Sequence, residues 1–494
     1  MDATKARASS YVLRGRENNE EAPVYCAFSE KEKIRSVAVA SMVTFLSPVS
    51  GSIYYPALQS LSQDLGVSIN TIYLTITVYM IFQGFTPLLT GTLSDQNGRR
   101  PVFVACLIVY IGVNIGLCVQ DSVLILFVLR CLQSVGSNGV SVVATATIAD
   151  LITRAERRKY MAYGSLGFTF GPAVGPVLGS VLTQFLGWRS IFAFLAIVAA
   201  TLLTLILAFL PETCRAMVGN GSVPAPWWNR SCLQWLRLSF QSGTIAEDRG
   251  TLVSPCHRPS LWDSIRITRQ RSTGLLILAS TTLSSGSTAI LANIPALFED
   301  HYRFNALQVG LCYLPDAIGA LSAPWTVGTL ADRNFRRCCR LAGITVARNQ
   351  QTPQQLLSMP MEKARLQLML PLVYVSAGVL TIYSWVMQMR VHVAGPLIPL
   401  FFLGNVISGA RNSLAMLIID IHAQRPATAS ASLAFFRSLA GAGVAAAMVP
   451  LIKAIGIAWT GTLVAATWLI VSPTIFTMHR YGHNWRRMDN SSKS

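Results

Sequence analysis

Runs of roughly 20 mostly apolar residues alternate with polar segments along almost the whole chain. A helix of about 20 residues is long enough to cross the hydrocarbon core of a bilayer. Lipid offers the backbone no hydrogen-bond partners, so each run is expected to be a helix, and none has the alternating pattern of a membrane β-barrel. The pattern predicts twelve spans, at 36–57, 72–93, 101–119, 123–149, 161–186, 190–210, 273–298, 307–330, 366–388, 394–419, 429–452 and 456–478.

Two longer polar segments, 211–272 and 331–365, interrupt this pattern. The first of them divides the twelve spans into two groups of six. The chain is therefore predicted to consist of a cytosolic N-terminal tail, a six-helix half, a cytosolic central loop, a second six-helix half and a cytosolic C-terminal tail, at 1–35, 36–210, 211–272, 273–478 and 479–494.

Composition and charge agree with a membrane protein. The chain of 494 residues is 52% hydrophobic and only 13% charged, whereas soluble domains are about 25% charged. Its net charge of +18 would suggest nucleic acid in a soluble protein, but 33 Lys and Arg lie on the side of the two tails and only 4 on the other. This is the positive-inside distribution, so both termini are expected in the cytosol and no nucleic-acid partner is expected. The plasma membrane is the expected location by default.

One short charged loop between two apolar runs occurs twice. Gly91–Arg100 and Gly328–Arg337 are identical at seven of their ten positions. Six spans separate the two copies, so both face the same side of the membrane, as parallel repeats related by an axis along the membrane normal require. The expected fold class is therefore an all-α membrane protein with twelve transmembrane helices in two six-helix parallel repeats.

The repeated loop combines residue types suited to a contact between helix ends. Glycine lets two helix ends approach closely, a carboxylate at a helix end accepts hydrogen bonds, and an arginine pair donates several. We expect a gating contact in each half, from Gly91, Asp95, Gly98, Arg99 and Arg100 in copy one and from Gly328, Asp332, Arg333, Arg336 and Arg337 in copy two. Copy one keeps Gly98 where copy two has Phe335, so copy one is expected to be the stricter gate.

Span five carries a stripe of glycines spaced three or four residues apart, which places them on one helical face. Such a face lets a neighbouring helix pack backbone to backbone. The stripe and its two prolines are Gly164, Gly167, Gly171, Pro172, Gly175, Pro176 and Gly179.

Span four contains an arginine about seven residues from its start, Arg130, followed by Gln133. A guanidinium is costly in lipid, so Arg130 is expected to face a watery cavity or a polar partner. The alternative is a structural arginine satisfied by carbonyl groups of a neighbouring helix.

Three more charges lie within spans of the second half. Asp316 in span eight is a carboxylate well inside a helix and is a candidate for carrying a coupled proton, or for a structural pair with an arginine. Arg411 in span ten and Arg437 in span eleven, with Asn405 one and a half turns before Arg411, are candidates for a substrate cavity. An arginine pair there would favour an anionic substrate, unless Arg411 instead extends to the nearby membrane surface.

These motifs resemble those of the major facilitator superfamily. The loop at Gly91–Arg100 resembles its motif A, with Gln96 at a position that is usually basic. The segment from Arg130 to Gln133 resembles motif B, although Ser134 stands where glycine is common. Gly171–Gly179 resembles motif C of the antiporters. The stretches Ser47–Leu58 and Leu74–Gly84 are similar to fungal twelve-span drug:proton antiporters, which include multidrug exporters and the citrate exporter.

This resemblance implies a latch that forms in one access state, an arginine linked to proton coupling at Arg130, and efflux rather than uptake. We therefore expect a monomeric proton-coupled antiporter that exports a small organic molecule, a drug or a secondary metabolite, by alternating access. The alternatives are a dedicated exporter of citrate-like organic acids and, less favoured, a transporter-like membrane sensor. Besides the substrate, protons and membrane lipid are the expected partners. No cofactor, metal site or enzymatic activity is expected, because the histidines are scattered and no phosphate-binding loop is present.

Overall fold

The computed structural model describes residues 28–152, 157–219, 229–235, 268–341, 361–422 and 426–491, and the single residues 223 and 226. The regular structure that it assigns in these residues is helical throughout. The first group of helices comprises α2 (Glu30–Thr44), α3 (Leu46–Ser52), η1 (Tyr55–Ala57), α4 (Leu58–Asp64), α5 (Ile69–Asn97), α6 (Arg99–Val119), α7 (Val123–Leu151), α8 (Arg157–Leu186), α9 (Arg189–Phe209) and α10 (Arg215–Val218).

The second group follows the central loop, most of which lies outside the described residues. It comprises α13 (Arg271–Tyr302), α14 (Ala306–Leu311), α15 (Leu314–Ala323), the π-helix η3 (Pro324–Gly328), α16 (Thr329–Leu341), α18 (Met361–Gln388), α19 (Ala394–Ile421), α20 (Pro426–Ile455) and α21 (Ile457–Ser491).

The helices fall where the apolar runs predict them. Eleven helical segments among the described residues are long and apolar enough to cross a membrane. The remaining predicted span, 161–186, lies within α8, whose described apolar part is Phe170–Leu186. The prediction of an all-α multi-pass membrane protein is therefore confirmed.

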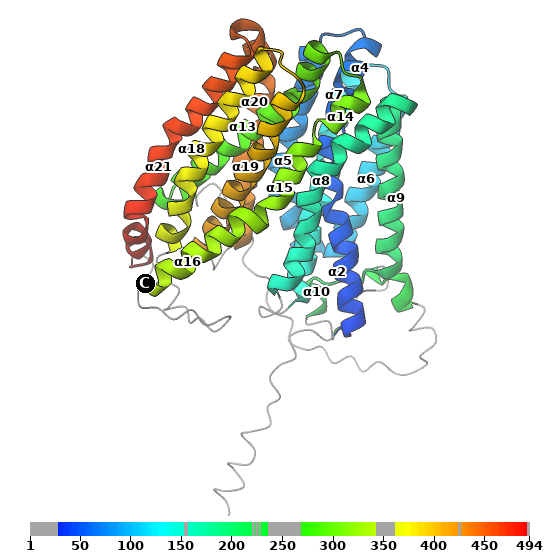
Figure 1. Cartoon of the computed structure of the whole chain (residues 1–494). Helices are drawn as coiled ribbons and strands as arrows, with labels where there is room; N and C mark the ends of the chain where they lie inside the picture. The colour runs from blue at the N-terminus through cyan, green and yellow to red at the C-terminus, as the bar shows by residue number, and fades with distance from the viewer. Residues whose placement is uncertain are drawn as a thin grey trace, which may run out of the picture.

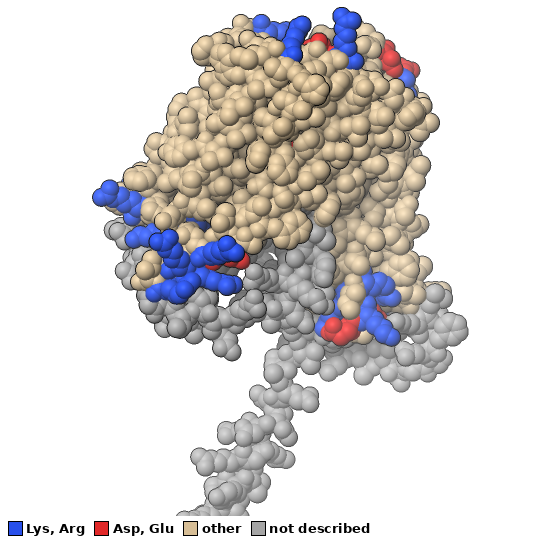
Figure 2. Space-filling view, viewed as in Figure 1, with Lys and Arg blue, Asp and Glu red and all other residues tan. Residues whose placement is uncertain are grey.

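Both repeated loops lie at the same end of the helix bundle, which we call the latch face; the opposite end is the far face. In Figure 1, α16 and the start of α2 are at the latch face, and α4 and α14 are at the far face. Figure 2 shows Lys and Arg gathered at the two ends, with a broad band free of charged residues between them. Such a band is what a bilayer core requires of the surface that it contacts.

Each group of six spans has its own hydrophobic core. One cluster of buried residues is built almost entirely from 37–210, and a second is built from 276–478. We call these groups the N-half and the C-half, since each buries its apolar residues mainly within itself.

The halves meet at the far face and in the middle of the bundle. The Tyr73 hydroxyl of α5 donates a hydrogen bond of 2.9 Å to the Ala292 carbonyl of α13. The rings of Tyr55 and Tyr313 stack across the same seam with centroids 6.5 Å apart. Deeper in the bundle, Phe85 of α5 packs edge-on against Phe435 of α20 at 5.0 Å.

One of the closest contacts between the halves is at Gly310. Gly310 of α14 lies directly against the Ser180 side chain of α8, so that any Cβ at Gly310 would overlap the Ser180 Oγ. In Figure 1, α16 stands apart from α2 and α10 at the latch face. The arrangement is therefore closed at the far face.

Candidate functional site

The first copy of the repeated loop forms a three-helix contact centred on Arg99. Its guanidinium lies 2.5 Å from the Asp95 carboxylate of α5 and 2.9 Å from the Asp150 carboxylate of α7. It also donates to the Ser94 hydroxyl at 2.6 Å. The side chain of Arg99 is only 11% exposed. One largely buried cation therefore joins α5, α6 and α7, because two carboxylates neutralise it and accept its hydrogen bonds.

Gly98 makes this contact possible by separating α5 from α6. Its φ of 96° lies in the region that side chains rarely adopt, and a Cβ there would come within 2.7 Å of the Glu212 carboxylate. A glycine is therefore required both for the turn and for the close approach of Glu212.

Glu212 fixes the start of α6 from the segment that follows span six. Its buried carboxylate accepts hydrogen bonds from the backbone N–H groups of Arg99 and Arg100, at 2.9 and 3.1 Å. The backbone N–H groups of Thr213 and Cys214 bond to the same carboxylate at 2.9 and 2.8 Å. A carboxylate at a helix N-terminus satisfies free N–H groups and interacts favourably with the helix dipole. The Arg100 side chain in turn donates to the Leu207 carbonyl at 3.2 Å.

The second copy of the loop has a different structure. Gly328 ends η3, and α16 then continues through Phe335 without the turn that Gly98 makes in copy one. The charged residues of this copy are exposed, and the described part of the structure records no hydrogen bond or ion pair for the side chains of Asp332, Arg333, Arg336 and Arg337.

In the C-half, the ion pair equivalent to that between Arg99 and Asp150 lies outside the repeated loop. Arg365, near the start of α18, lies 2.7 Å from the Asp420 carboxylate at the end of α19. These are the third and fourth spans of the C-half, as α6 and α7 are of the N-half. An ion pair between the third and fourth spans is thus present in both halves. The sequence repeat, in contrast, aligns Arg99 with Arg336.

Arg130 lies in the interior of the N-half and is 1% exposed. Its guanidinium donates to the Gln133 side chain at 2.5 Å and lies over the rings of Tyr54 and Tyr79, 3.9 and 4.5 Å from their centroids. Gln133 donates onward to Asn114 at 2.7 Å. The structure therefore brings Arg130 and Gln133 together.

Arg130 has no carboxylate partner among the described residues, and its Nε has no hydrogen-bond acceptor. Its positive charge is held by two aromatic faces and an amide, in the manner of a cation–π site. Sequence reasoning did not select Tyr54, Tyr79 or Asn114. The sequence feature that could have identified them is that each carries a polar group within an apolar run.

The three charges of the C-half form one electrostatic group. Arg411 of α19 interacts electrostatically with both Asp316 of α15 and Arg437 of α20. All three side chains are partly buried, and the structure records no hydrogen bond or ion pair for them within the described residues. Two cations and one carboxylate leave a net positive charge between three helices, which suits an anion better than a cation.

Asn405 lies next to this group but has partners of its own. Its amide donates to the Ser322 hydroxyl at 2.7 Å and to the Thr326 hydroxyl at 2.9 Å. Both hydroxyls are on the α15–η3 segment, where the helix widens into a π-turn, a feature often found at functional sites. Asn405 therefore ties α19 to this irregular segment.

The glycine stripe of α8 packs against the first span of the same half. A Cβ at Gly167 would lie 2.5 Å from the Thr44 side chain, and one at Gly171 would lie 2.5 Å from Pro48. Gly175 lies against Ser52 and Gly179 against the Ile53 carbonyl, both too close for any Cβ.

The predicted backbone-to-backbone contact is thus present from Gly167 to Gly179. Gly164 lies outside the described side chains. Of the two prolines, Pro172 is exposed, whereas Pro176 is buried and faces Gly310 across the seam between the halves.

Comparison with known proteins gives one consistent family. The family model described as Major Facilitator Superfamily matches residues 40–446. MFS-type transporter clz19 of Cochliobolus lunatus is 37% identical over 98% of this chain and 91% of its own length. Citrate exporter 1 of Aspergillus niger is 30% identical over 94% of this chain and 89% of its own length.

Solved structures agree on the fold. The xylose transporter XylE from E. coli, in a partially occluded inward-open conformation, aligns with a TM-score of 0.59 over 91% of this chain and 99% of that one, at 13% identity. At this identity the likeness extends to the fold alone.

Proposed function

Since this chain belongs to the Major Facilitator Superfamily, we propose that it is a proton-coupled antiporter that exports a small organic molecule, a drug or secondary metabolite. The chain is a transporter and not an enzyme. Export by alternating access would require the far-face seam to open and the latch of Arg99 to rearrange as the halves rock about the middle of the bundle.

The observation that carries this proposal is the buried charge in both halves. Arg130 in the N-half has no carboxylate partner within the described residues, and Arg411 in the C-half interacts electrostatically with the carboxylate of Asp316 and with the guanidinium of Arg437. Charges inside a membrane domain are costly and mark ion or substrate pathways. Asp316 is the candidate carrier of the coupled proton, and Arg130 is the candidate that links proton binding to the N-half.

Purified protein in liposomes with an imposed pH gradient tests the coupling. Ethidium and citrate serve as probes of the two substrate classes. We expect the pH gradient to drive accumulation of at least one probe, a protonophore to abolish it, and Asp316→Asn to remove the dependence on the gradient. Accumulation that is indifferent to the pH gradient would exclude antiport, and absence of any probe flux with specific probe binding would favour a transporter-like sensor.

A second candidate function, export of an organic acid, is favoured by the pairing of Arg411 with Arg437. Hydrogen bonds to charged groups contribute about 1.5–3 kcal/mol. We therefore expect Arg411→Ala to lower citrate uptake about 10- to 100-fold and to leave ethidium uptake nearly unchanged, measured as initial rates in the same liposomes. Arg411→Lys, which keeps the charge, should retain more citrate uptake than Arg411→Ala.

Equal citrate uptake by the Arg411→Ala variant and the unmodified chain would remove the organic-acid candidate. Equal loss of both probes would instead indicate that Arg411 serves the coupling or the fold rather than substrate choice.

A further inference from the structure

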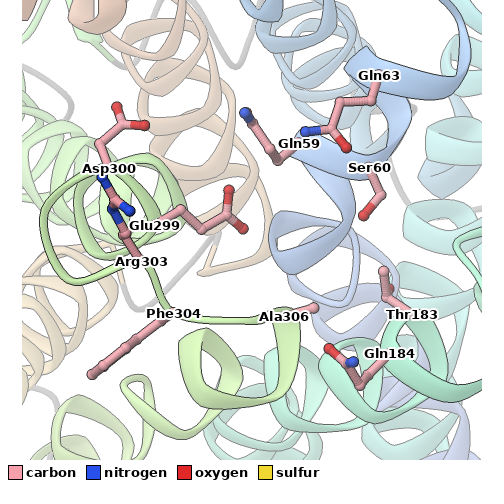
Figure 3. A pocket seen from close by; sticks show the side chains of 10 residues that line it. All are labelled: Gln59, Ser60, Gln63, Thr183, Gln184, Glu299, Asp300, Arg303, Phe304 and Ala306. Carbon is pink, nitrogen blue, oxygen red and sulfur yellow. The ribbon is translucent and has the colours of Figure 1, made fainter.

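A pocket of about 480 Å³ lies between the two halves at the far face. Its walls come from both halves, so its shape depends on how the halves meet (Figure 3). The residues from the N-half include Thr183 and Gln184 of α8, and those from the C-half include Glu299, Asp300 and Arg303.

Glu299 is the acidic residue that enters this pocket. Figure 3 shows its carboxylate pointing into the open centre, whereas that of Asp300 points away from it. Glu299 is partly buried and Asp300 is exposed. Within the described residues, the structure records no hydrogen bond or ion pair for the Glu299 carboxylate.

Glu299 also lies on the face of α13 that meets the N-half. Ala292, whose carbonyl accepts the hydrogen bond from Tyr73, precedes Glu299 by seven residues, which is two helical turns. Separation of the halves at the far face would therefore expose Glu299 to water. Closure returns it to the pocket.

Other charges near the pocket do not neutralise Glu299. On α13 and just after it are Asp300, His301 and the exposed Arg303. The charge of His301 interacts with Asp300 and with Arg390 from the loop after α18. On α4, the Asp64 carboxylate accepts a hydrogen bond from the Trp188 indole at 2.7 Å. The side chains that α8 contributes to the pocket, Thr183 and Gln184, are uncharged.

We infer that Glu299 is a proton-binding residue of the far-face gate: the seam closes with Glu299 protonated and opens with it ionised. Moving a carboxylate from water into a pocket where it is partly buried and has no partner among the described residues disfavours its charged form. The closed state therefore binds the proton more tightly than the open state, so a lower pH at the far face stabilises closure. The proton comes from solution on that side and returns to it on opening.

This gate is separate from the coupling proton proposed for Asp316. It concerns an equilibrium between two arrangements of the protein and requires no transported solute. Its test can therefore succeed or fail independently of the proposed antiport.

Cysteine labelling in nanodiscs tests the gate. Thr183 is 8% exposed in this closed arrangement, so Thr183→Cys reports opening through its rate of reaction with a maleimide. The chain that keeps Glu299 should react about tenfold faster than its Glu299→Gln variant at about pH 8, and this difference should shrink as the pH is lowered toward about 4, where Glu299 is protonated in the open arrangement as well. Comparison at one pH cancels the reagent's own pH dependence, and the chain without the reporter gives the background from native cysteines.

Two further variants separate this role from a structural one. Asp300→Asn, a neighbouring charge that points away from the pocket, should behave like the parent, and Glu299→Asp should keep the pH response. Equal rates for the parent and its Glu299→Gln variant at about pH 8, or an equal effect of Asp300→Asn, would overturn the inference.

Discussion

Replacing Arg99 with alanine is expected to lower pH-driven uptake at least about 100-fold, for whichever of citrate and ethidium the unmodified chain carries. The substitution removes one cation from two carboxylates, Asp95 and Asp150, that lie 2.5 and 2.9 Å from it. Breaking a buried ion pair by removing one partner costs about 3–5 kcal/mol. This free energy is lost from the latch, because the ion pairs of Arg99 join α5, α6 and α7 there.

The repeated loop supplies a matched control for this prediction. Arg336 occupies the same place in copy two, but it is exposed and has no recorded ion pair among the described residues. Arg336→Ala is therefore expected to keep at least about half of the uptake, since surface charges contribute about 0–1 kcal/mol. Equal losses from the two substitutions, at equal yields of protein inserted in the membrane, would contradict the asymmetry of the two copies.

Replacing Arg130 with methionine is expected to abolish pH-driven uptake without lowering the thermal stability of the protein. Removing a buried cation that has no carboxylate partner among the described residues also removes its desolvation cost, and methionine fills much of the space between Tyr54 and Tyr79. The cation–π contacts that are lost contribute about 0.5–2 kcal/mol each, which offsets part of that gain.

Liposome uptake and thermal unfolding of the purified protein separate the two effects. Retained uptake in Arg130→Met would exclude a role in coupling, and a markedly lower unfolding temperature would identify Arg130 as a structural residue instead. Arg130→Lys is an informative companion because it keeps the charge but loses the planar group that stacks on the two rings. We expect it to retain the fold and little of the uptake.

The two copies of the repeated loop show how much of a structure a sequence repeat can predict. Seven of ten identical residues correctly indicated two copies at the same face. They did not indicate that Phe335 lets α16 run on as a helix, so that the arginines of copy two remain on the surface. Arg365, outside the repeat, takes the position equivalent to Arg99, because that position is defined by the third span of each half and not by the motif.

The polar network around Arg130 illustrates a second limit. Arg130 and Gln133 are close in sequence and share one helix face, so their contact was predictable. Tyr54, Tyr79 and Asn114 reach the same place from three other segments of the N-half. Their convergence depends on how α5, α6, α7 and the segment between α3 and η1 pack, which hydrophobic periodicity does not specify.

By itself, the sequence determined the class of this protein: a multi-pass helical membrane protein, with the positions of its spans and the existence of a duplicated loop. These features follow from local physics, because each apolar run must satisfy its backbone within one helix when it is surrounded by lipid. Only the tertiary structure decided which charges meet: Arg99 with Asp150, Arg365 with Asp420, Glu212 with the start of α6, and Glu299 with a pocket shared by the halves. The physical reason is that each of these contacts joins residues far apart in the chain, and helix packing, not spacing along the sequence, sets the distance between them.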